Sequence, residues 1–452
     1  MASIGVALSG GGHRASLFGL GALLYLADSG KSGEVTSIAS VSGGSLTNGY
    51  LAQEAAGGRT EFSNMAPDEF REVAGRLARR IAMGGTLWAT PLTWLYVAGL
   101  ALVGLAVMVG VWFLPWPGWV RVVAFFVGLL ALAWLGSLRG AVCARALART
   151  LFSPGGRPTR LDEVATGVDH VICATDLHAG EHVYFSGRFV CNYRYGWGEP
   201  GDLPLHIAVQ ASAALPGGFP PRRLSSGRHN FRDGKEPKAR GAPMVLADGG
   251  VYDNMGDQWA HGAARRNDRW AALRPDLRVP DQIVVVNASA PMDWEPTGSL
   301  RLPFVGEFLA LKRDQSILYD NGTSVRREAM VAAFRRAEEV GRGMRGAIVQ
   351  IDQNPARLAN GFALGGDELA RRARHALELL QDDEAAWEQA RVASTEVKTH
   401  LSRMRLEEAA GLLRHGYALA MTNLHILLDF PPLKVPTLET FAQLLAVEAR
   451  RP

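Results

Sequence analysis

Cysteine is scarce in this sequence, and the few cysteines follow no recognisable pattern. Three are present among 452 residues, Cys143, Cys173 and Cys191. Their spacing matches no zinc motif and three thiols cannot all pair, so neither a structural metal site nor a disulfide-stabilised secreted fold is expected. A secretory leader is also missing, because ASIGVALSGGG is typical of a core strand that begins almost at Met1. These absences favour a reducing, cytoplasmic setting.

A large excess of either charge is likewise missing. The 48 Lys and Arg residues against 44 Asp and Glu residues give a net charge of +4 and a pI near 9.0. This mild positive balance suits an anionic membrane surface but is too diffuse to indicate nucleic acid, so no nucleic-acid partner is expected. The chain is long enough for roughly two to three domain-sized units.

One long part of the chain lacks charge altogether. Residues 81–120 contain no charged side chain, and after Arg121 none occurs in residues 122–138. A helix that crosses a bilayer needs about 20 mostly apolar residues, so we expect two transmembrane helices, at about residues 92–114 and 119–138. The segment PWPGW between them breaks the helix and supplies tryptophans of the kind found at membrane interfaces, which predicts a tight hairpin.

Arginines flank this predicted hairpin. They are Arg76, Arg79 and Arg80 before it, and Arg139, Arg145 and Arg149 after it. The connecting turn is nearly free of charge, so the positive-inside bias predicts that both ends, and the domain attached to them, face the cytoplasm. A pair of buried helices in a soluble domain is the alternative, but core helices seldom lack charge over such a length.

The rest of the sequence predicts an α/β protein. In about the first 60 residues, strand-like segments (IGVALS, VTSIASV) alternate with helical ones, as in folds with parallel strands. Strand-like segments return after the hairpin (HVICATDL, HVYFSGRFV, MVLADGG, QIVVVNASA), and helical patterns dominate from about residue 307, apart from the strand-like AIVQID. We therefore expect four parts, at residues 1–80, 81–150, 151–300 and 301–452.

A glycine-rich loop, LSGGGHR, spans residues 8–14. Glycines between an apolar strand and a helix let backbone N–H groups point outward at the positive end of the helix dipole, where they can bind a phosphate or an oxyanion. A purely structural turn is the alternative. The loop lacks the G-x-x-x-x-G-K-[ST] pattern of a nucleotide-binding P-loop, and Gly10 and Gly12 only begin a G-x-G-x-x-G pattern, because the next required position holds Ala15.

The segment SVSGGS, residues 40–45, has the form of a nucleophile elbow. Such an elbow holds a serine on a strained turn between a strand and a helix, with small residues two positions to either side. Around Ser42 these are Ser40 and Gly44, so the motif is S-x-S-x-G rather than G-x-S-x-G. A simple helix cap at Ser42 is the alternative, and Ser45 is a weaker nucleophile candidate because it should lie inside the helix.

An aspartate ends a later apolar strand, in LADGGVYDNMG. Two glycines follow Asp248, which places its carboxylate on a tight turn where it can accept a proton; an ordinary turn aspartate is the alternative. Together, GGGHR, SVSGG and DGG resemble the motifs of the patatin-like phospholipase family, and they occur in the family's order. ATDL, FSGRF and AVQASAALPGGFPP strengthen the resemblance, which covers about residues 4–80 and 150–290.

This resemblance implies a three-layer α/β/α sandwich with a mostly parallel central sheet, here interrupted by the hairpin. It also implies a Ser–Asp dyad without histidine, in which Ser42 attacks an ester carbonyl and Asp248 acts as general base. The amides of Gly10, Gly11 and Gly12 would form the oxyanion hole.

Other polar residues near these motifs have lesser expected roles. Arg14 would fix the loop or a lipid phosphate, and Asp253 would be structural. His13 is an alternative base beside the glycine loop. The HAGEH segment has the helical spacing of metal ligands (His178, Glu181, His182), but Gly180 indicates a turn between strands, so no metal and no cofactor are expected.

These features predict a membrane-anchored serine acyl hydrolase that cleaves fatty acids from phospholipids or related lipid esters. Residues 1–80 and 151–300 would form its catalytic domain, and residues 301–452 would pack on it. Three alternatives stay open: a catalytically vestigial lipid-binding or regulatory protein, a signal-activated phospholipase that damages membranes, and an acyl transferase. Headgroup, acyl position and oligomeric state have no signal in the sequence.

Overall fold

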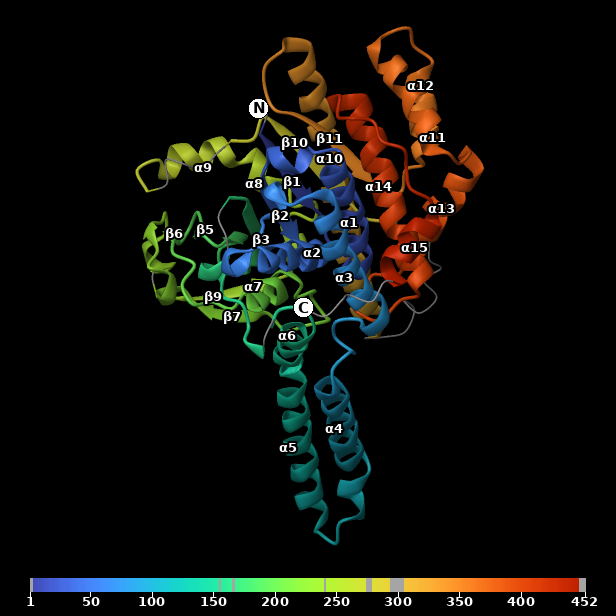
Figure 1. Cartoon of the computed structure of the whole chain (residues 1–452). Coiled ribbons are helices and arrows are strands. Elements are labelled where there is room, and N and C mark those ends of the chain that lie inside the picture. The colour runs from blue at the N-terminus through green and yellow to red at the C-terminus, as the bar shows by residue number, and fades with distance from the viewer. Residues whose placement is uncertain are drawn as a thin grey trace.

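The computed structural model describes residues 3–153, 156–164, 167–239, 241–273, 279–292 and 305–446. A globular body holds the sheet and most helices, and a helical hairpin projects from it (Figure 1). The expected boundary at residue 300 falls in residues 293–304, and the last expected part ends with residues 447–452. Both segments lie outside the described residues.

One sheet of eleven strands runs through the described part of the body, in the order β11-β10-β1-β2-β3-β4-β5-β6-β8, with β9 pairing with β3 and β7. The parallel strands are β1 (Ile4–Leu8), β2 (Val35–Val41), β3 (Asp169–Asp176), β10 (Gln282–Asn287) and β11 (Arg345–Gln350). The antiparallel strands are β4 (Glu181–Phe185), β5 (Val190–Asn192), β6 (Gly196–Gly198), β7 (Arg222–Ser225), β8 (Arg232–Asp233) and β9 (Pro243–Ala247).

The sheet is therefore mixed, and the prediction of a mostly parallel sheet is wrong. Parallel neighbours need a crossover, which α1 (Gly12–Asp28) supplies between β1 and β2. From β3 to β6 the connections are too short for this. The chain turns from β3 into β4 within four residues, where Gly180 has a φ of +67°, so the two strands must run antiparallel.

Helices cover both faces of the parallel half. Val6 and Leu8 face a core shared with α1, α2 (Ser42–Glu54) and α14 (Leu406–Leu428), whereas Ala7 faces α8 (Gln258–His261) and α10 (Val305–Val340). This alternation follows the two-residue period of a strand. The remaining helices of the body are α3 (Pro67–Gly84), α7 (Leu205–Ser212), α9 (Ala263–Trp270), α11 (Pro355–Ala363), α12 (Glu368–Leu380), α13 (Glu384–Glu396) and α15 (Leu438–Ala446).

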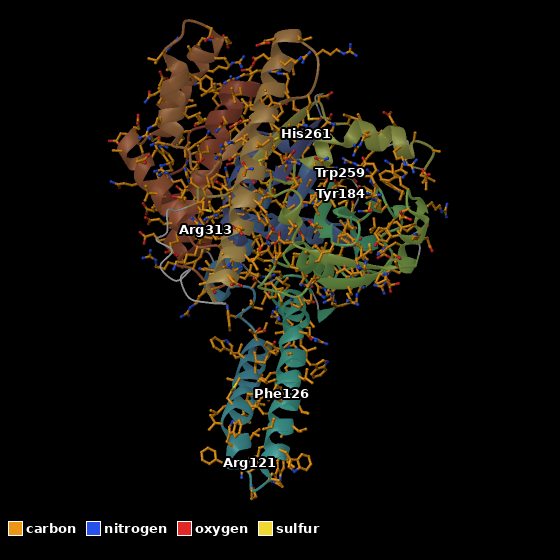
Figure 2. All side chains as sticks on the ribbon, turned by 180° about the vertical axis from the view of Figure 1, so that it is seen from behind. Arg121, Phe126, Tyr184, Trp259, His261 and Arg313 are labelled. Carbon is orange, nitrogen blue, oxygen red and sulfur yellow. The ribbon has the colours of Figure 1, made fainter. Side chains whose placement is uncertain are left out.

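The projecting hairpin consists of α4 (Pro91–Met108) and α5 (Gly118–Ser137), and α6 (Arg139–Thr150) leads back into the body (Figure 1). The first helix ends before the expected residue 114, because a tight 3-10 turn over Gly110–Phe113 precedes the prolines. Both helices are long and apolar enough to cross a membrane, and their side chains point outward rather than into a core (Figure 2). The hydroxyl of Tyr96 donates to the carbonyl of Leu135 at 3.0 Å and links the two helices.

Helix α14 packs on α1 with the two backbones in contact. A Cβ added at Gly416 would lie 2.1 Å from the carbonyl oxygen of Phe18, whereas one added at Gly411 on the same helix would meet no atom within 4 Å.

We therefore expect opposite effects from one substitution at these two positions. Gly416→Ala must push the helices apart and should lower the free energy of unfolding by about 1–3 kcal/mol. Gly411→Ala should raise it by up to about 1 kcal/mol, since alanine favours the helix. Thermal unfolding in detergent measures both, and equal midpoints for the two variants would contradict this packing.

Candidate active site

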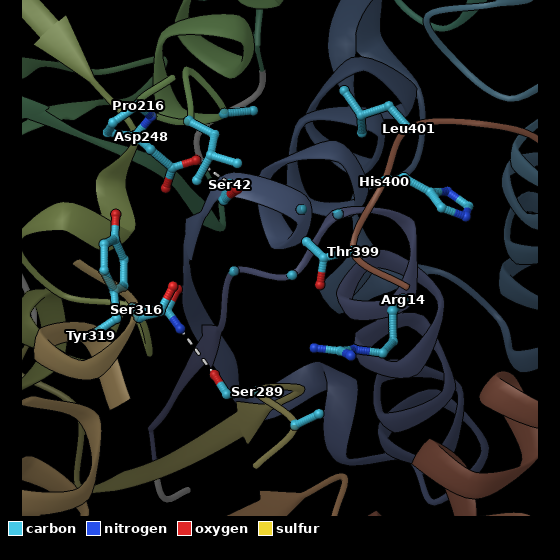
Figure 3. Close-up of a pocket in the computed structure, with 18 of the residues that line it drawn as sticks. Arg14, Ser42, Pro216, Asp248, Ser289, Ser316, Tyr319, Thr399, His400 and Leu401 are labelled. Carbon is cyan, nitrogen blue, oxygen red and sulfur yellow. Dashed lines mark hydrogen bonds between the residues drawn. The ribbon is translucent and has the colours of Figure 1, made fainter. Parts of the chain in front are cut away.

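Ser42 occupies a strained turn between β2 and α2. Its φ is +48°, a left-handed value that a residue with a side chain seldom adopts. The hydroxyl does not cap the helix; it donates to Oδ2 of Asp248 at 2.8 Å (Figure 3). This geometry is that of a nucleophile elbow rather than of a simple helix cap.

Two glycines after Ser42 let the elbow contact the glycine-rich loop directly. A Cβ at Gly43 would lie 2.1 Å from the carbonyl oxygen of Gly12, and one at Gly44 would lie 2.7 Å from that of Leu8. The two loops thus pack backbone against backbone, which only glycine allows at these positions.

The serine at position 40, where the elbow pattern has glycine, belongs to a buried hydroxyl chain beneath the elbow. Ser40 Oγ lies 3.0 Å from Ser45 Oγ, which lies 2.9 Å from Ser212 Oγ. Ser212 accepts the backbone N–H of Ser42 at 3.0 Å and donates to the carbonyl of Cys173 at 2.6 Å. Ser45 is therefore a supporting residue here, and Ser212, which the sequence did not single out, holds the backbone amide of Ser42.

Asp248 follows β9 on a tight turn. Its Oδ1 accepts the N–H of Gly250 at 2.8 Å while Oδ2 accepts Ser42, and its carbonyl accepts the hydroxyl of Thr175. Burial raises the pKa of the Asp248 carboxyl from 3.8 to about 6, although the hydrogen bonds from Ser42 and Gly250 oppose this shift. The side chain is therefore mainly ionised at neutral pH and can accept the serine proton.

The three predicted oxyanion glycines do not have the same surroundings. The amide of Gly10 donates to the carbonyl of Asn254 at 2.9 Å. Among the described residues, the amides of Gly11 and Gly12 have no acceptor, and both residues line the same cavity as Ser42. Their φ values of +135° and +58° favour glycine. Gly12 is also the first residue of α1, so its N–H lies at the positive end of the helix dipole.

Arg14 and His13 fix the glycine-rich loop to other parts of the chain. Arg14 donates from Nε to the carbonyl of Ala288 and from Nη1 to that of Val397, and burial lowers its pKa to about 10. His13 contacts the carbonyl of Ser402 and the hydroxyl of Thr86, and burial lowers its pKa to about 4. Both ring nitrogens are thus engaged away from Ser42, which argues against His13 as the base.

The segment that these residues contact is a strap, residues 397–404, between α13 and α14. The N–H of His13 donates to the carbonyl of His400, and the N–H groups of Thr86 and Leu87 donate to that of Leu401. The strap therefore joins the glycine-rich loop to the base of the hairpin.

The other polar residues singled out in the sequence lie outside the cavity. Asp253 accepts the N–H groups of Met255 and Gln258 and lies 3.5 Å from Arg326 of α10, so it holds a turn. His182 contacts the carbonyl of Gly249 from behind the site. Within the described residues, no group of three His, Cys, Asp or Glu side chains is placed to hold a metal ion.

Ser42 and Asp248 open into a cavity of about 590 Å³. The cavity is lined by the three glycines, Arg14, Asn254 and Ser289, and by the apolar side chains of Leu87, Trp88, Leu215, Pro216, Phe219 and Met292. It is also lined by the strap residues Thr399, His400, Leu401 and Ser402, and by Gln315, Ser316, Tyr319, Asp320 and Thr323 of α10 (Figure 3). The hydroxyl of Tyr319 is buried, and its pKa is raised by burial and by the nearby Asp248. Nothing in the sequence of helix α10 indicated that it would line the site.

Comparison with known proteins identifies the family. The model of the patatin-like phospholipase family matches residues 6–256. The chain therefore belongs to the patatin-like phospholipase family, a family of lipid acyl hydrolases.

The comparison with solved structures also found matches, among them a human cytosolic phospholipase. Human GIVD cytosolic phospholipase A2 in complex with methyl gamma-linolenyl fluorophosphonate is 15% identical, with a TM-score of 0.45, over 99% of this chain and 60% of that one. VipD from Legionella pneumophila is 14% identical, with a TM-score of 0.32, over 95% of this chain and 67% of that one. The chain thus spans about 60% of the length of the human phospholipase. No curated protein matches the sequence.

The raised pKa of Asp248 predicts a pH dependence for the reactivity of Ser42. Below about pH 6 the carboxyl is protonated and cannot take the serine proton, so reactivity should fall about tenfold per pH unit. The rate of Ser42 labelling by a fluorophosphonate probe, followed from pH 4.5 to 8, measures this. A rate that stays level down to pH 4.5 would show that Asp248 is not the base.

Proposed function

We propose that this protein is a membrane-anchored serine acyl hydrolase that cleaves ester-linked fatty acids from phospholipids or related lipid esters. The observation that carries the proposal is the 2.8 Å hydrogen bond from Ser42 to Asp248 inside a largely apolar cavity. Family membership supports a lipid ester as the substrate.

In the proposed reaction, the dyad transfers one proton back and forth. Ser42 Oγ bonds to the ester carbonyl carbon while Asp248 takes its proton, and Asp248 then gives that proton to the departing alkoxide. This leaves the fatty acid bound to Ser42 as an ester. Water then attacks the acyl carbon, its proton passes through Asp248 to Ser42 Oγ, and the free fatty acid leaves.

The developing oxyanion needs hydrogen-bond donors in the same cavity. The amides of Gly11 and Gly12 suit this role because no described acceptor competes for them. One such donor is worth about 3 kcal/mol of transition-state stabilisation in other hydrolases. The amide of Gly10, which donates to Asn254, would instead hold the loop against the turn that follows Asp248.

The exposed hairpin supports a membrane anchor. Its apolar side chains lie outside the body: Phe113, Trp119 and Leu130 are 82%, 72% and 71% exposed. Exposure of a contiguous apolar surface of this size to water is unfavourable, whereas its contact with lipid chains is favourable. The flanking arginines orient the anchor with the catalytic body on the cytoplasmic side.

Removing either member of the dyad should abolish hydrolysis. Ser42→Ala deletes the nucleophile and Asp248→Asn the base, so release of fatty acid from phospholipid vesicles should fall by at least about a thousandfold in each. Ser289→Ala, which removes another hydroxyl from the cavity, should cost far less. Mass spectrometry of the released lipids measures all three, and undiminished release by the Ser42 variant would refute the dyad.

The anchor predicts both membrane retention and a defined topology. The protein should stay with membranes after an alkaline carbonate wash.

A cysteine in the hairpin turn (Gly118→Cys) should react with an impermeant maleimide from outside intact cells. A cysteine at the exposed Glu407 of the body (Glu407→Cys) should react only after permeabilisation. The native cysteines are buried and do not compete. Labelling of Glu407→Cys in intact cells would reverse the orientation.

A further inference from the structure

The apolar end of the catalytic cavity lies at the foot of the hairpin. Trp88 stands three residues before α4, and it lines the cavity together with Leu215 and Phe219. The loop that carries Leu215 and Phe219 is held by α6, which directly follows the hairpin, because Arg139 donates to the carbonyl of Gly218 at 2.8 Å. The chain that enters the hairpin and the chain that leaves it therefore both meet this end of the cavity.

A second hollow begins at the same tryptophan and runs along α4. We call it the trough; its residues are Trp88, Ala89, Thr90, Pro91, Trp94, Leu95 and Ala98. Pro91, Trp94 and Ala98 recur at helical spacing and lie on one face of the helix. Trp88 lines both hollows, so its side chain stands at the boundary between the trough and the catalytic cavity.

Two of the polar side-chain groups in the wall of the trough are already hydrogen-bonded within the protein. The indole N–H of Trp94 donates to the carbonyl of Trp88 at 3.1 Å, and the hydroxyl of Thr90 pairs with that of Thr93. The rings of Trp88 and Trp94 lie 5.2 Å apart. The polar groups of α4, at Thr93 and Tyr96, lie on the opposite face of the helix, and Tyr96 bonds α5 there. The wall is therefore mainly apolar, and an apolar ligand matches it.

We infer that the trough is a binding site for the acyl chain of a membrane lipid, which reaches Ser42 past Trp88. The inference rests on the proposed function. It commits to a lipid chain as occupant because the trough occupies the first two turns of a helix with membrane-span composition and shares a residue with the catalytic cavity. A chain that follows this path moves from bilayer to active site without exposure to water, so it keeps the free energy of its apolar contacts.

Filling the trough tests the inference. Ala98→Trp places an indole in the trough, and Ala131→Trp makes the same change on an exposed position of α5 outside it. The full-length proteins are assayed on dioleoyl phospholipid in vesicles and on the soluble dibutyryl phospholipid of the same headgroup. The ratio of the two kcat/KM values should fall at least about tenfold in Ala98→Trp, the cost of keeping about two methylenes out of an apolar site. It should change less than about twofold in Ala131→Trp.

The outcomes separate this inference from the proposed function. If wild type cleaves both substrates through Ser42 but the ratio is the same in Ala98→Trp and wild type, the trough is not an acyl-chain site and the hydrolase stands. A similar fall in Ala131→Trp would also overturn the inference, because it would report a general disturbance of the hairpin. If wild type cleaves neither substrate, the proposed function fails and the inference fails with it. Vesicle flotation confirms that each variant remains anchored.

Discussion

The site depends on one close contact, the backbone of the glycine-rich loop lying directly against the backbone of the elbow. Because a Cβ at Gly43 would overlap Gly12, this contact fixes the distance between the nucleophile and the free amides of the loop. Both segments leave neighbouring parallel strands, β1 and β2, at the same edge of the sheet, where α/β folds place their ligands. Asp248 reaches this edge from β9, which pairs with the end of β3. The hydrogen bond from Ser42 to Asp248 thus joins segments that only the completed sheet brings together.

How much of this was predictable depends on how local each signal is. The glycine-rich loop, the elbow and the aspartate turn are short motifs whose backbone demands are visible in sequence, and the structure brings Ser42 and Asp248 within hydrogen-bonding distance. The sheet was predicted wrongly because apolar strands after the hairpin look alike in sequence whether they pair parallel or antiparallel. The short turn at Gly180 was the feature that indicated antiparallel pairing. Ser212 lies in the recognised segment AVQASAALPGGFPP, but nothing in that segment indicated its hydrogen bond to the Ser42 amide. Tyr319 had no local signal, because its position at the site arises only where α10 meets the cavity.

The strap gives the C-terminal helices a part in the site that their sequence patterns did not indicate. Through backbone hydrogen bonds it holds His13 in the glycine-rich loop and Thr86 and Leu87 at the foot of the hairpin. Arg14 is buried against the start of the same segment, where its guanidinium donates to the carbonyl of Val397. The position of the hairpin and that of the glycine-rich loop are therefore set by one piece of chain, which keeps the cavity aligned with whatever surface the hairpin occupies.

The position of the cavity at the foot of the hairpin also affects the proposed chemistry of Ser42 and Asp248. Burial already raises the pKa of Asp248 to about 6, close to the value at which a base is both ionised and basic enough at neutral pH. An acyl chain that fills the apolar end of the cavity displaces water and strengthens every electrostatic interaction at Ser42 and Asp248. If the proposed substrate enters from lipid at this end, the site would become drier as it is occupied, and the Asp248 carboxylate would become a stronger base with the ester in place. In the proposed dyad without histidine, this coupling between occupancy and basicity would supply part of what a third catalytic residue provides elsewhere.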